Sequence, residues 1–253
     1  MSVEVLALRT PTLPPATHTN CYLLDGRTVV EPASPWPEEQ ERLEQWLADR
    51  APERILLTHH HPDHIGGVRR LRAALALPVL AHAWTAEALP FEVDQTLDDG
   101  DDLHGWEVLL TPGHTPGHLC LHRDGEVVCG DMIASDGTIV LDPPEGDLAL
   151  YLASLERLKA LSPRVLHPAH GAPITDAVAK LDEYIDHRNH RTEQIRNALA
   201  AGAVDPLGVV EIVYGDTIPR FVYPLAARQA VCHLQWLEAR GEVVRERDHW
   251  RTT

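Results

Sequence analysis

In residues 58–64, Thr-His-His-His-Pro-Asp-His, four imidazoles and one carboxylate share a single short loop. An apolar run, Ile55–Leu57, leads into this loop, and the amphipathic pattern of Val68–Leu75 predicts a helix after it. Imidazole and carboxylate groups together suit zinc and other borderline divalent metal ions. The succession of strand, loop and helix therefore indicates a metal site.

The spacing within this loop suits two metal ions. In an extended or tightly turning segment His59 and His61 point the same way, because side chains alternate with period two. Asp63 and His64 follow the turn at Pro62 and can aim at a second position. The alternative interpretation is a solvated, His-rich surface loop, and the rest of the chain argues against it.

A His or Asp soon after an apolar strand recurs three more times along the chain. Ligands at successive strand ends are expected to converge on one edge of a sheet, where sites are built. Asp131 taken alone fits a turn cap as well as a site residue, and His118 fits a core or supporting imidazole. The strands and motifs are Trp106–Leu110 before residues 111–118 with His114, Val127–Cys129 before Asp131, and Arg164–Leu166 before residues 167–171 with His170.

Charge is distributed unevenly over the 253 residues, whose formal net charge is −16. Residues 188–253 hold nine Arg against eight Asp and Glu, a balance of +1, so residues 1–187 carry −17. This acidity argues against broad, nonspecific nucleic-acid binding. A basic patch in the C-terminal part remains an open alternative.

Cysteine usage and the N-terminal residues favour a cytoplasmic protein. The first residues lack the basic and apolar segments of a signal peptide, and no apolar run approaches a membrane span. Four widely spaced cysteines without a CxxC pair favour buried thiols over disulfides. We therefore expect no membrane partner; a homodimer is compatible with the sequence, although no stretch demands one. The cysteines are Cys21, Cys120, Cys129 and Cys232.

The chain is long enough for a large domain with a small appendage, and we expect it to divide near residue 175. Helix, helix and β ribbon in the last part are similar to a small winged helix. We predict a catalytic domain at 1–175 and a helical, winged-helix-like extension at 176–253. The patterns predict a long helix from Asp176 to about Ala203, helices over 209–214 and 225–240, and a strand or β ribbon over 242–247.

Together these motifs resemble the metallo-β-lactamase superfamily. Residues 58–64 match its T-H-x-H-x-D-H signature, and later segments match its other motifs in the family's order. Those segments are Pro112–His114, Gly130–Asp131 and Pro168–Gly171, in which Ala169 stands where the family usually has Gly. The resemblance covers residues 3 to about 175. It implies the α/β class, with an αββα four-layer sandwich before the winged-helix-like appendage.

Carried over to this sequence, the resemblance implies two divalent metal ions, zinc first, with Mn²⁺ and Fe²⁺ as alternatives. Asp131 would bridge both ions and is, with Asp63, an expected catalytic residue. Asn20 lies in a segment similar to a T-N-T-Y-L strand of the family, so Asn20 and His118 are candidates for supporting or substrate-proximal roles. The implied ligands are His59, His61 and His114 for the first metal, and Asp63, His64 and His170 for the second.

His64 separates the subgroups of this family. True β-lactamases usually lack it and often use a Cys where this chain has Asp131, so β-lactam hydrolysis is a poor interpretation. His61 argues against the flavodiiron branch, which normally has Glu there. Residues 184–195 and the segments after them are similar to the lactamase-β-like endoribonuclease group, which also includes relatives acting on thioesters. Hydroxyacylglutathione hydrolases share the metal motifs, but their glutathione-binding segment is not recognisable here.

The expected function is that of a dinuclear zinc hydrolase, in which a metal-bridging hydroxide attacks an ester, thioester or phosphodiester. Cleavage of single-stranded RNA is a more specific alternative, which the C-terminal resemblance prompts and the acidity of residues 1–187 opposes. An iron-dependent dioxygenase of the persulfide type and a non-catalytic binding module are alternatives from other classes. The expected partner is thus a small ester or thioester, or single-stranded RNA. Arg188, Arg191 and Gln194 are expected on a solvated helix face that ties the C-terminal part to the core, with substrate contact as the alternative.

Overall fold

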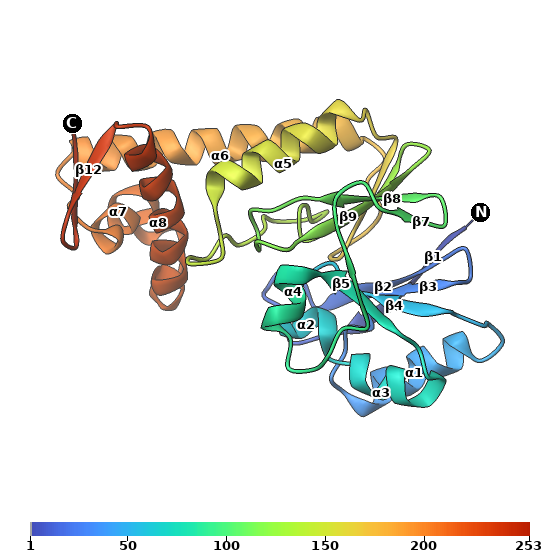
Figure 1. Ribbon diagram of the computed structural model, residues 1–253. Helices are drawn as coiled ribbons and strands as arrows, with labels where there is room; N and C mark the ends of the chain where they lie inside the picture. Colours follow the sequence, from blue (N-terminus) through green and yellow to red (C-terminus); the bar gives the residue numbers. More distant parts are fainter. Residues whose placement is uncertain (1) are drawn as a thin grey trace.

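Two β-sheets stacked face to face form the centre of the computed structural model, which describes residues 2–253 (Figure 1). The first sheet has the strand order β1-β2-β3-β4-β5-β6, and the second has the order β11-β10-β9-β8-β7. The first comprises β1 (Val3–Arg9), β2 (His18–Leu24), β3 (Thr28–Val30), β4 (Arg54–Leu56), β5 (Val79–His82) and β6 (Gln95–Leu97). The second comprises β7 (Asp102–Leu103), β8 (Trp106–Leu110), β9 (Leu119–Arg123), β10 (Glu126–Gly130) and β11 (Val165–Pro168).

Helices cover the outer face of each sheet. Helices α1 (Pro37–Leu47) and α3 (Val68–Leu75) pack on the first sheet, and α5 (Leu148–Ala160) and α6 (Ala177–Ala200) pack on the second (Figure 1). Two short helices, α2 (Pro62–Ile65) and α4 (Ala83–Ala88), lie in connecting segments. The predicted αββα four-layer sandwich is therefore confirmed.

The alternation of side chains along β2 explains how the layers stay together. Tyr22 and Leu24 point into the apolar cluster between the two sheets, whereas Cys21 and Leu23 point into the cluster beneath the outer helices. All four residues are buried, because β2 is covered on both faces. The free cysteines are all buried, as predicted.

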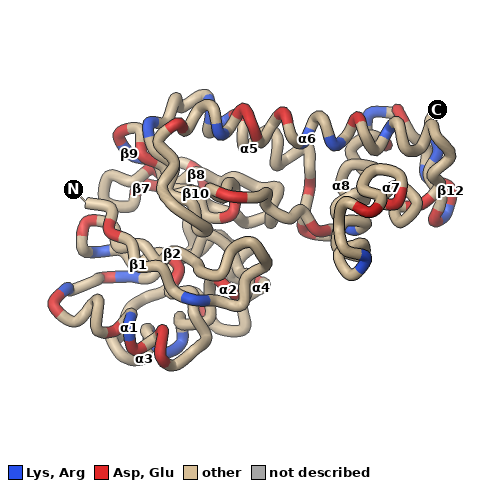
Figure 2. Tube along the Cα trace, turned by 180° about the vertical axis from the view of Figure 1, so that it is seen from behind, with Lys and Arg blue, Asp and Glu red and all other residues tan. Residues whose placement is uncertain are grey.

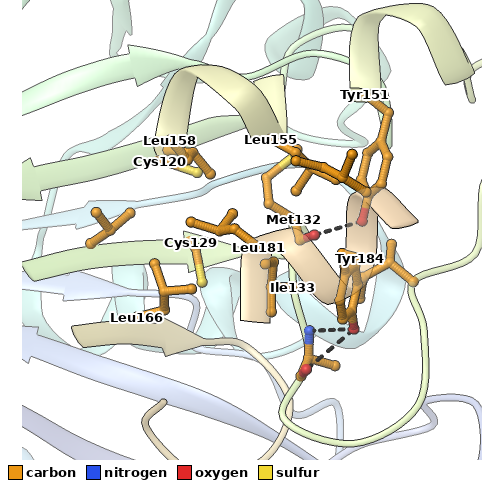
Figure 3. Packing of buried hydrophobic residues seen from close by; sticks show 14 of the residues in the cluster. Cys120, Cys129, Met132, Ile133, Tyr151, Leu155, Leu158, Leu166, Leu181 and Tyr184 are labelled. Atoms are coloured by element: carbon orange, nitrogen blue, oxygen red, sulfur yellow. Dashed lines mark hydrogen bonds between the residues drawn. The ribbon is translucent and has the colours of Figure 1, made fainter. Parts of the chain in front are cut away.

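Two tyrosines from the helices above the second sheet hold the segment that follows β10 (Figure 3). The Tyr151 hydroxyl donates a hydrogen bond of 2.6 Å to the Met132 carbonyl. The Tyr184 hydroxyl, from α6, accepts a hydrogen bond of 2.9 Å from the Ala134 amide. Asp131 lies at the start of this segment, so α5 and α6 fix the backbone beside a candidate site residue.

The candidate ligands do not all lie on one sheet, and this corrects the expectation from the sequence. His59 and His61 follow β4 of the first sheet, whereas His114, Asp131 and His170 follow β8, β10 and β11 of the second. The strands β8, β10 and β11 run in the same direction, since β9 is antiparallel to both β8 and β10, and β10 is parallel to β11. Their ends therefore meet β4 at one end of the sandwich.

The C-terminal extension has an apolar core of its own, to which Leu234, Leu237 and Trp250 contribute. Its wing pairs a strand within the predicted residues 242–247 with a second strand that lies just beyond them. The long helix α6 enters both this core, through Ile195, and the core above the second sheet, through Leu181. The elements are α7 (Pro206–Tyr214), η1 (Gly215–Thr217), η2 (Arg220–Val222), α8 (Tyr223–Ala239), β12 (Val243–Glu246) and β13 (His249–Thr252). The division at residue 175 stays a prediction.

Within residues 2–253, none of the helices is both long and apolar enough for a membrane span.

Candidate metal centre

The loop after β4 changes conformation at Pro62. His61 is extended, with φ −63° and ψ 146°, and Pro62 is the first residue of the one-turn helix α2. Proline suits this position because its fixed φ matches a helix and its missing N–H has no partner there anyway. His59 and His61 thus project from extended backbone, whereas Asp63 and His64 project from a helical turn.

The first group of ligand atoms contains three imidazoles, which come from two strand ends. His61 Nδ1 lies 3.1 Å from His59 Nε2 and 3.0 Å from His114 Nε2. His114 Nε2 lies 3.5 Å from Asp131 Oδ2. The ligand atoms of these four residues all lie within 4.8 Å of one another, which is close enough to surround one metal ion.

A second group of ligand atoms lies on the other side of the same aspartate. Asp131 Oδ1 lies 3.5 Å from His64 Nε2 and 3.3 Å from His170 Nε2. Asp63 completes the group, since its two oxygens lie 3.7 Å from His64 Nε2 and 3.7 Å from His170 Nε2. Each oxygen of Asp131 therefore faces a different set of imidazoles.

Unpaired polar atoms mark the middle of these groups. His64 Nε2 and Asp131 Oδ1 are buried and, within residues 2–253, have no hydrogen-bond partner. Leaving such atoms unpaired in a protein interior is costly. A donor set of five imidazoles and two carboxylates, arranged around an unpaired carboxylate oxygen, fits two divalent cations.

Burial sets the protonation state of most of the imidazoles. Burial lowers the pKa of His59 well below its usual value and lowers the pKa of His114 to about 4, so both rings are neutral at pH 7. Burial would also lower the pKa of His64, but Glu31 and Asp131 outweigh it and raise that pKa. Metal ligation needs the neutral ring, so a bound cation would displace this proton.

The second nitrogen of most rings is held by the protein, which fixes which nitrogen faces the centre. His114 Nδ1 lies 2.9 Å from the Val140 carbonyl, and His170 Nδ1 lies 2.9 Å from the His18 carbonyl. An imidazole N–H donates in both bonds, so each ring turns its Nε2 toward Asp131. The geometry is that of pre-oriented ligands.

A cleft of about 1020 Å³ opens over both groups. Its walls contain many prolines and aliphatic side chains, together with the carboxylates of Asp136, Asp142 and Glu145. Arg228 is the one Lys or Arg in the lining, and it is paired with Asp142. Acidic and basic residues are otherwise spread along the whole trace (Figure 2). The cleft is therefore apolar and acidic, with no free cationic side chain among the residues that the structure describes.

Residues 14–170 match the sequence pattern of the metallo-beta-lactamase superfamily. The chain belongs to this superfamily. Residues 206–250 also match the beta-lactamase associated winged helix domain, which confirms the predicted appendage. Superfamily membership and the matching fold agree with the resemblance that the motifs indicated.

Three proteins with known names have sequences similar to this chain. The Drosophila melanogaster protein named beta-lactamase-like protein 2 homolog is 31% identical over 211 residues, which is 75% of this chain and 69% of that protein. The probable metallo-hydrolase YqjP of Bacillus subtilis is 26% identical over 296 residues, covering 93% of this chain and 92% of its own. A Klebsiella pneumoniae hydroxyacylglutathione hydrolase is 43% identical over 90 residues, 34% of this chain and 35% of its own.

Solved superfamily structures extend the likeness over the whole fold. A beta-lactamase domain protein from Burkholderia ambifaria superimposes with a TM-score of 0.88, covering 99% of this chain and 91% of that one, at 23% identity. TTHA1623, crystallised in a di-iron-bound form, is 32% identical with a TM-score of 0.57, covering 68% of this chain and 96% of that one.

The two predicted supporting residues, Asn20 and His118, form hydrogen bonds to backbone groups beside the site. His118 Nε2 accepts a hydrogen bond of 3.1 Å from the Asp131 amide, and its Nδ1 lies 2.9 Å from Thr111 Oγ1. Asn20 Nδ2 donates to the carbonyls of Pro168, at 2.9 Å, and Gly171, at 2.7 Å. Neither side chain joins the two ligand groups. They position Asp131 and the turn that carries His170.

Glu31 is a site residue that the sequence analysis missed. Its carboxylate lies 2.9 Å from His64 Nδ1 and accepts a hydrogen bond from the Thr58 hydroxyl. Only 1% of it is exposed, and its φ of 56° turns the chain sharply after β3. Nothing in the Pro-rich segment around it indicates this, because Glu31 meets the ligand loop only through the pairing of β3 with β4.

A second missed carboxylate stands at the rim of the site. Glu145 Oε2 lies 3.2 Å from His60 Nε2 and 3.6 Å from His61 Nε2. His60 lies between two candidate ligands in sequence but belongs to neither of the two ligand groups. It meets this rim carboxylate beside His61.

Proposed function

We propose that this chain is a dinuclear metal hydrolase that carries zinc. His59, His61 and His114 would hold one ion, Asp63, His64 and His170 would hold the other, and Asp131 would contact both. The single observation that carries the proposal is the position of Asp131, whose two oxygens face separate sets of imidazoles.

When bound, two zinc ions supply hydroxide at neutral pH and polarise a carbonyl or phosphoryl oxygen. The chain's own part is to hold the ligands and to exclude other nucleophiles. Burial raises the pKa of Cys120 to about 12 and raises that of Cys129 well above its usual value, so these thiols stay protonated. The carboxylate of Asp131 stays ionised, because His64 and His170 offset the cost of its burial and lower its pKa.

The cleft supports an uncharged ester or thioester as the substrate. Its apolar walls suit an acyl chain, and its carboxylates would repel a polyanion. Arg228 is already paired with Asp142, so it offers little to a phosphodiester backbone. The RNA alternative rests on the resemblance of residues 184–195 and the later segments to the lactamase-β-like endoribonuclease group, and on the winged-helix extension.

Iron chemistry is a second candidate that one relative favours. The structure of TTHA1623 is described as a di-iron-bound form. An iron-dependent dioxygenase would consume molecular oxygen, whereas a hydrolase would not. Metal analysis of the purified protein, together with oxygen uptake on a persulfide, separates the two.

The test compares the wild type with Asp131→Ala, and Asp248→Ala in the wing serves as a matched carboxylate control. We expect two zinc ions per wild-type chain and turnover of a simple thioester. Asp131→Ala should lower turnover by at least about 10³-fold, as the loss of a central catalytic group does. Asp248→Ala should match the wild type. Undiminished turnover by Asp131→Ala would sink the proposal, and metal-dependent cleavage of labelled single-stranded RNA alone would favour the alternative.

A further inference from the structure

A second cavity, of about 190 Å³, lies between α6, α7 and α8. It adjoins the cleft over the metal centre, since Thr138 and Gln229 line both spaces. A water molecule takes about 30 Å³ in the liquid, so this cavity has the volume of about six waters. That is room for a small ion or for the end group of a longer molecule.

The polar part of the lining is basic. Arg188, Arg191 and His187 face this cavity, and no Asp or Glu is among its lining residues. Neither arginine forms an ion pair within residues 2–253, whereas most of the chain's other cations do. In a protein of net charge −16, two unpaired guanidinium groups on one cavity are an unexpected concentration of positive charge.

Arg188 corrects the expectation of a solvated helix face, because only 2% of it is exposed. One of its nitrogens donates to the Ile139 carbonyl, and its guanidinium lies 5.2 Å from the ring of Tyr151. Its Nε is buried and has no hydrogen-bond partner in the described part of the chain. Burying a charged donor unpaired is costly, so this atom calls for an acceptor.

Neighbouring groups respond to this positive charge. Burial, with the nearby guanidiniums of Arg188 and Arg191, lowers the pKa of His233 to about 3. The same causes lower the pKa of His187. The guanidinium carbon of Arg191 lies 4.2 Å from the centre of the Tyr214 ring, and this cation–π contact holds the side chain at the cavity.

We propose that this cavity is an oxyanion site that binds a phosphate group. Planar guanidinium groups match phosphate oxygens in two-pronged contacts, and Arg188 and Arg191 both line this cavity without an ion pair among the described residues. The phosphate is either a free ion or the end of a substrate that reaches over from the adjoining cleft. The second source rests on the proposed hydrolase function, whereas the first does not.

Calorimetric titration of the metal-loaded protein with inorganic phosphate tests the site. Arg191→Gln is the informative variant, because Arg191 is half-buried and its loss leaves the metal ligands in place. We expect phosphate binding to weaken about ten- to hundred-fold, as the loss of one charge-assisted contact does. Arg245→Gln in the wing is the matched control and should bind like the wild type. Equal affinity in Arg191→Gln and the wild type would overturn the proposal and assign phosphate binding to the metals.

A pair of thioesters with one acyl group distinguishes the two sources. The thiol part is uncharged N-acetylcysteamine in one and a phosphorylated pantetheine in the other. If the phosphate belongs to the substrate, Arg191→Gln raises KM for the phosphorylated thioester by about tenfold and leaves the uncharged one unchanged. If Arg191→Gln and the wild type have equal KM values for the phosphorylated thioester, while the variant binds inorganic phosphate more weakly, the site belongs to the free ion. Absence of any thioester turnover would count against the hydrolase and leave the phosphate titration valid.

Discussion

Two glycines with positive φ, one beside the metal centre and one in the C-terminal extension, have opposite surroundings. Gly113 has φ +130°, and a Cβ built on it would lie 2.2 Å from the backbone nitrogen of Tyr151. Gly202 has φ +105°, and the same atom would meet nothing within 4 Å. The ligand turn is pressed against α5, whereas the turn after α6 is open. The position of His114, a proposed metal ligand, is thus set by backbone packing, whereas the turn at Gly202 has room for a side chain.

Exchanging each glycine for alanine should give the largest contrast. Gly113→Ala adds a backbone clash to the strain of positive φ, so we expect a loss of about 4 kcal/mol in the free energy of unfolding. Gly202→Ala carries only the strain, about 1 kcal/mol. Denaturant unfolding of both variants measures the difference. Similar losses of unfolding free energy in the two variants would mean that the turn at His114 can shift away from α5 at little cost.

A smaller effect separates two carboxylate–imidazole pairs, one inside the site and one outside it. Glu31 holds His64, whereas Glu126 lies 3.1 Å from the ring of His167 at the surface. Glu31→Gln should weaken metal binding about 10- to 100-fold, because outer partners orient ligands and raise their basicity. Glu126→Gln should leave the affinity unchanged. Competition with a chelator measures both, and equal affinities would remove Glu31 from the site.

The extension should lose stability in mild acid through one histidine. Burial, with nearby arginines, lowers the pKa of His233 to about 3 in the folded protein, against about 6.5 when unfolded. As pH falls below 6.5 the unfolded chain takes up the proton first, so stability declines until pH approaches 3. Between pH 7 and 5 this contribution is about 2 kcal/mol. His233→Leu leaves the Thr192 hydroxyl bonded to the Arg188 carbonyl at 3.0 Å.

The measurement is the free energy of unfolding at pH 7 and pH 5 for the wild type and His233→Leu. The wild type should lose about 2 kcal/mol more than the variant over this interval. Identical losses in the two proteins would show that His233 is accessible to protons in the folded state.

The smallest contrast concerns two ion pairs of arginine. Arg123 is largely buried, stacks 4.1 Å from the ring of Trp106 and, by hydrogen bonding, lowers the pKa of Asp25 to about 2. Arg251 in the wing is exposed and pairs with Glu246. We expect Arg123→Gln to cost about 1.5 kcal/mol and Arg251→Gln less than about 0.5 kcal/mol, measured by thermal unfolding. A larger loss from Arg251→Gln would reverse the comparison.

The sequence predicts those parts of the site that are encoded locally. Strand and ligand adjoin in the chain at His59, His114 and Asp131, so an apolar run followed by a turn is enough to find them. Glu31 and Arg188 escape this reasoning because their roles come from distant partners. Glu31 meets His64 through strand pairing, and Arg188 is buried beside residues far from it in the chain, among them Ile139 and Tyr151. The candidate ligands come together from strands of both sheets, and this also follows only from the assembled fold.

Helix α6 has a consequence for the order in which the protein forms during synthesis. Leu181 and Tyr184 close the apolar layer above the second sheet, and Ile195 begins the core of the extension on the same continuous helix. When the ribosome has released only the residues up to His170, every proposed metal ligand has emerged, but of the two helices that cover that sheet only α5 has emerged with them. N-terminal segments fold first where they can. Here the hydrogen bond from the Ala134 amide to Tyr184, close to Asp131, forms only after α6 has emerged, so the surroundings of the proposed site are completed late.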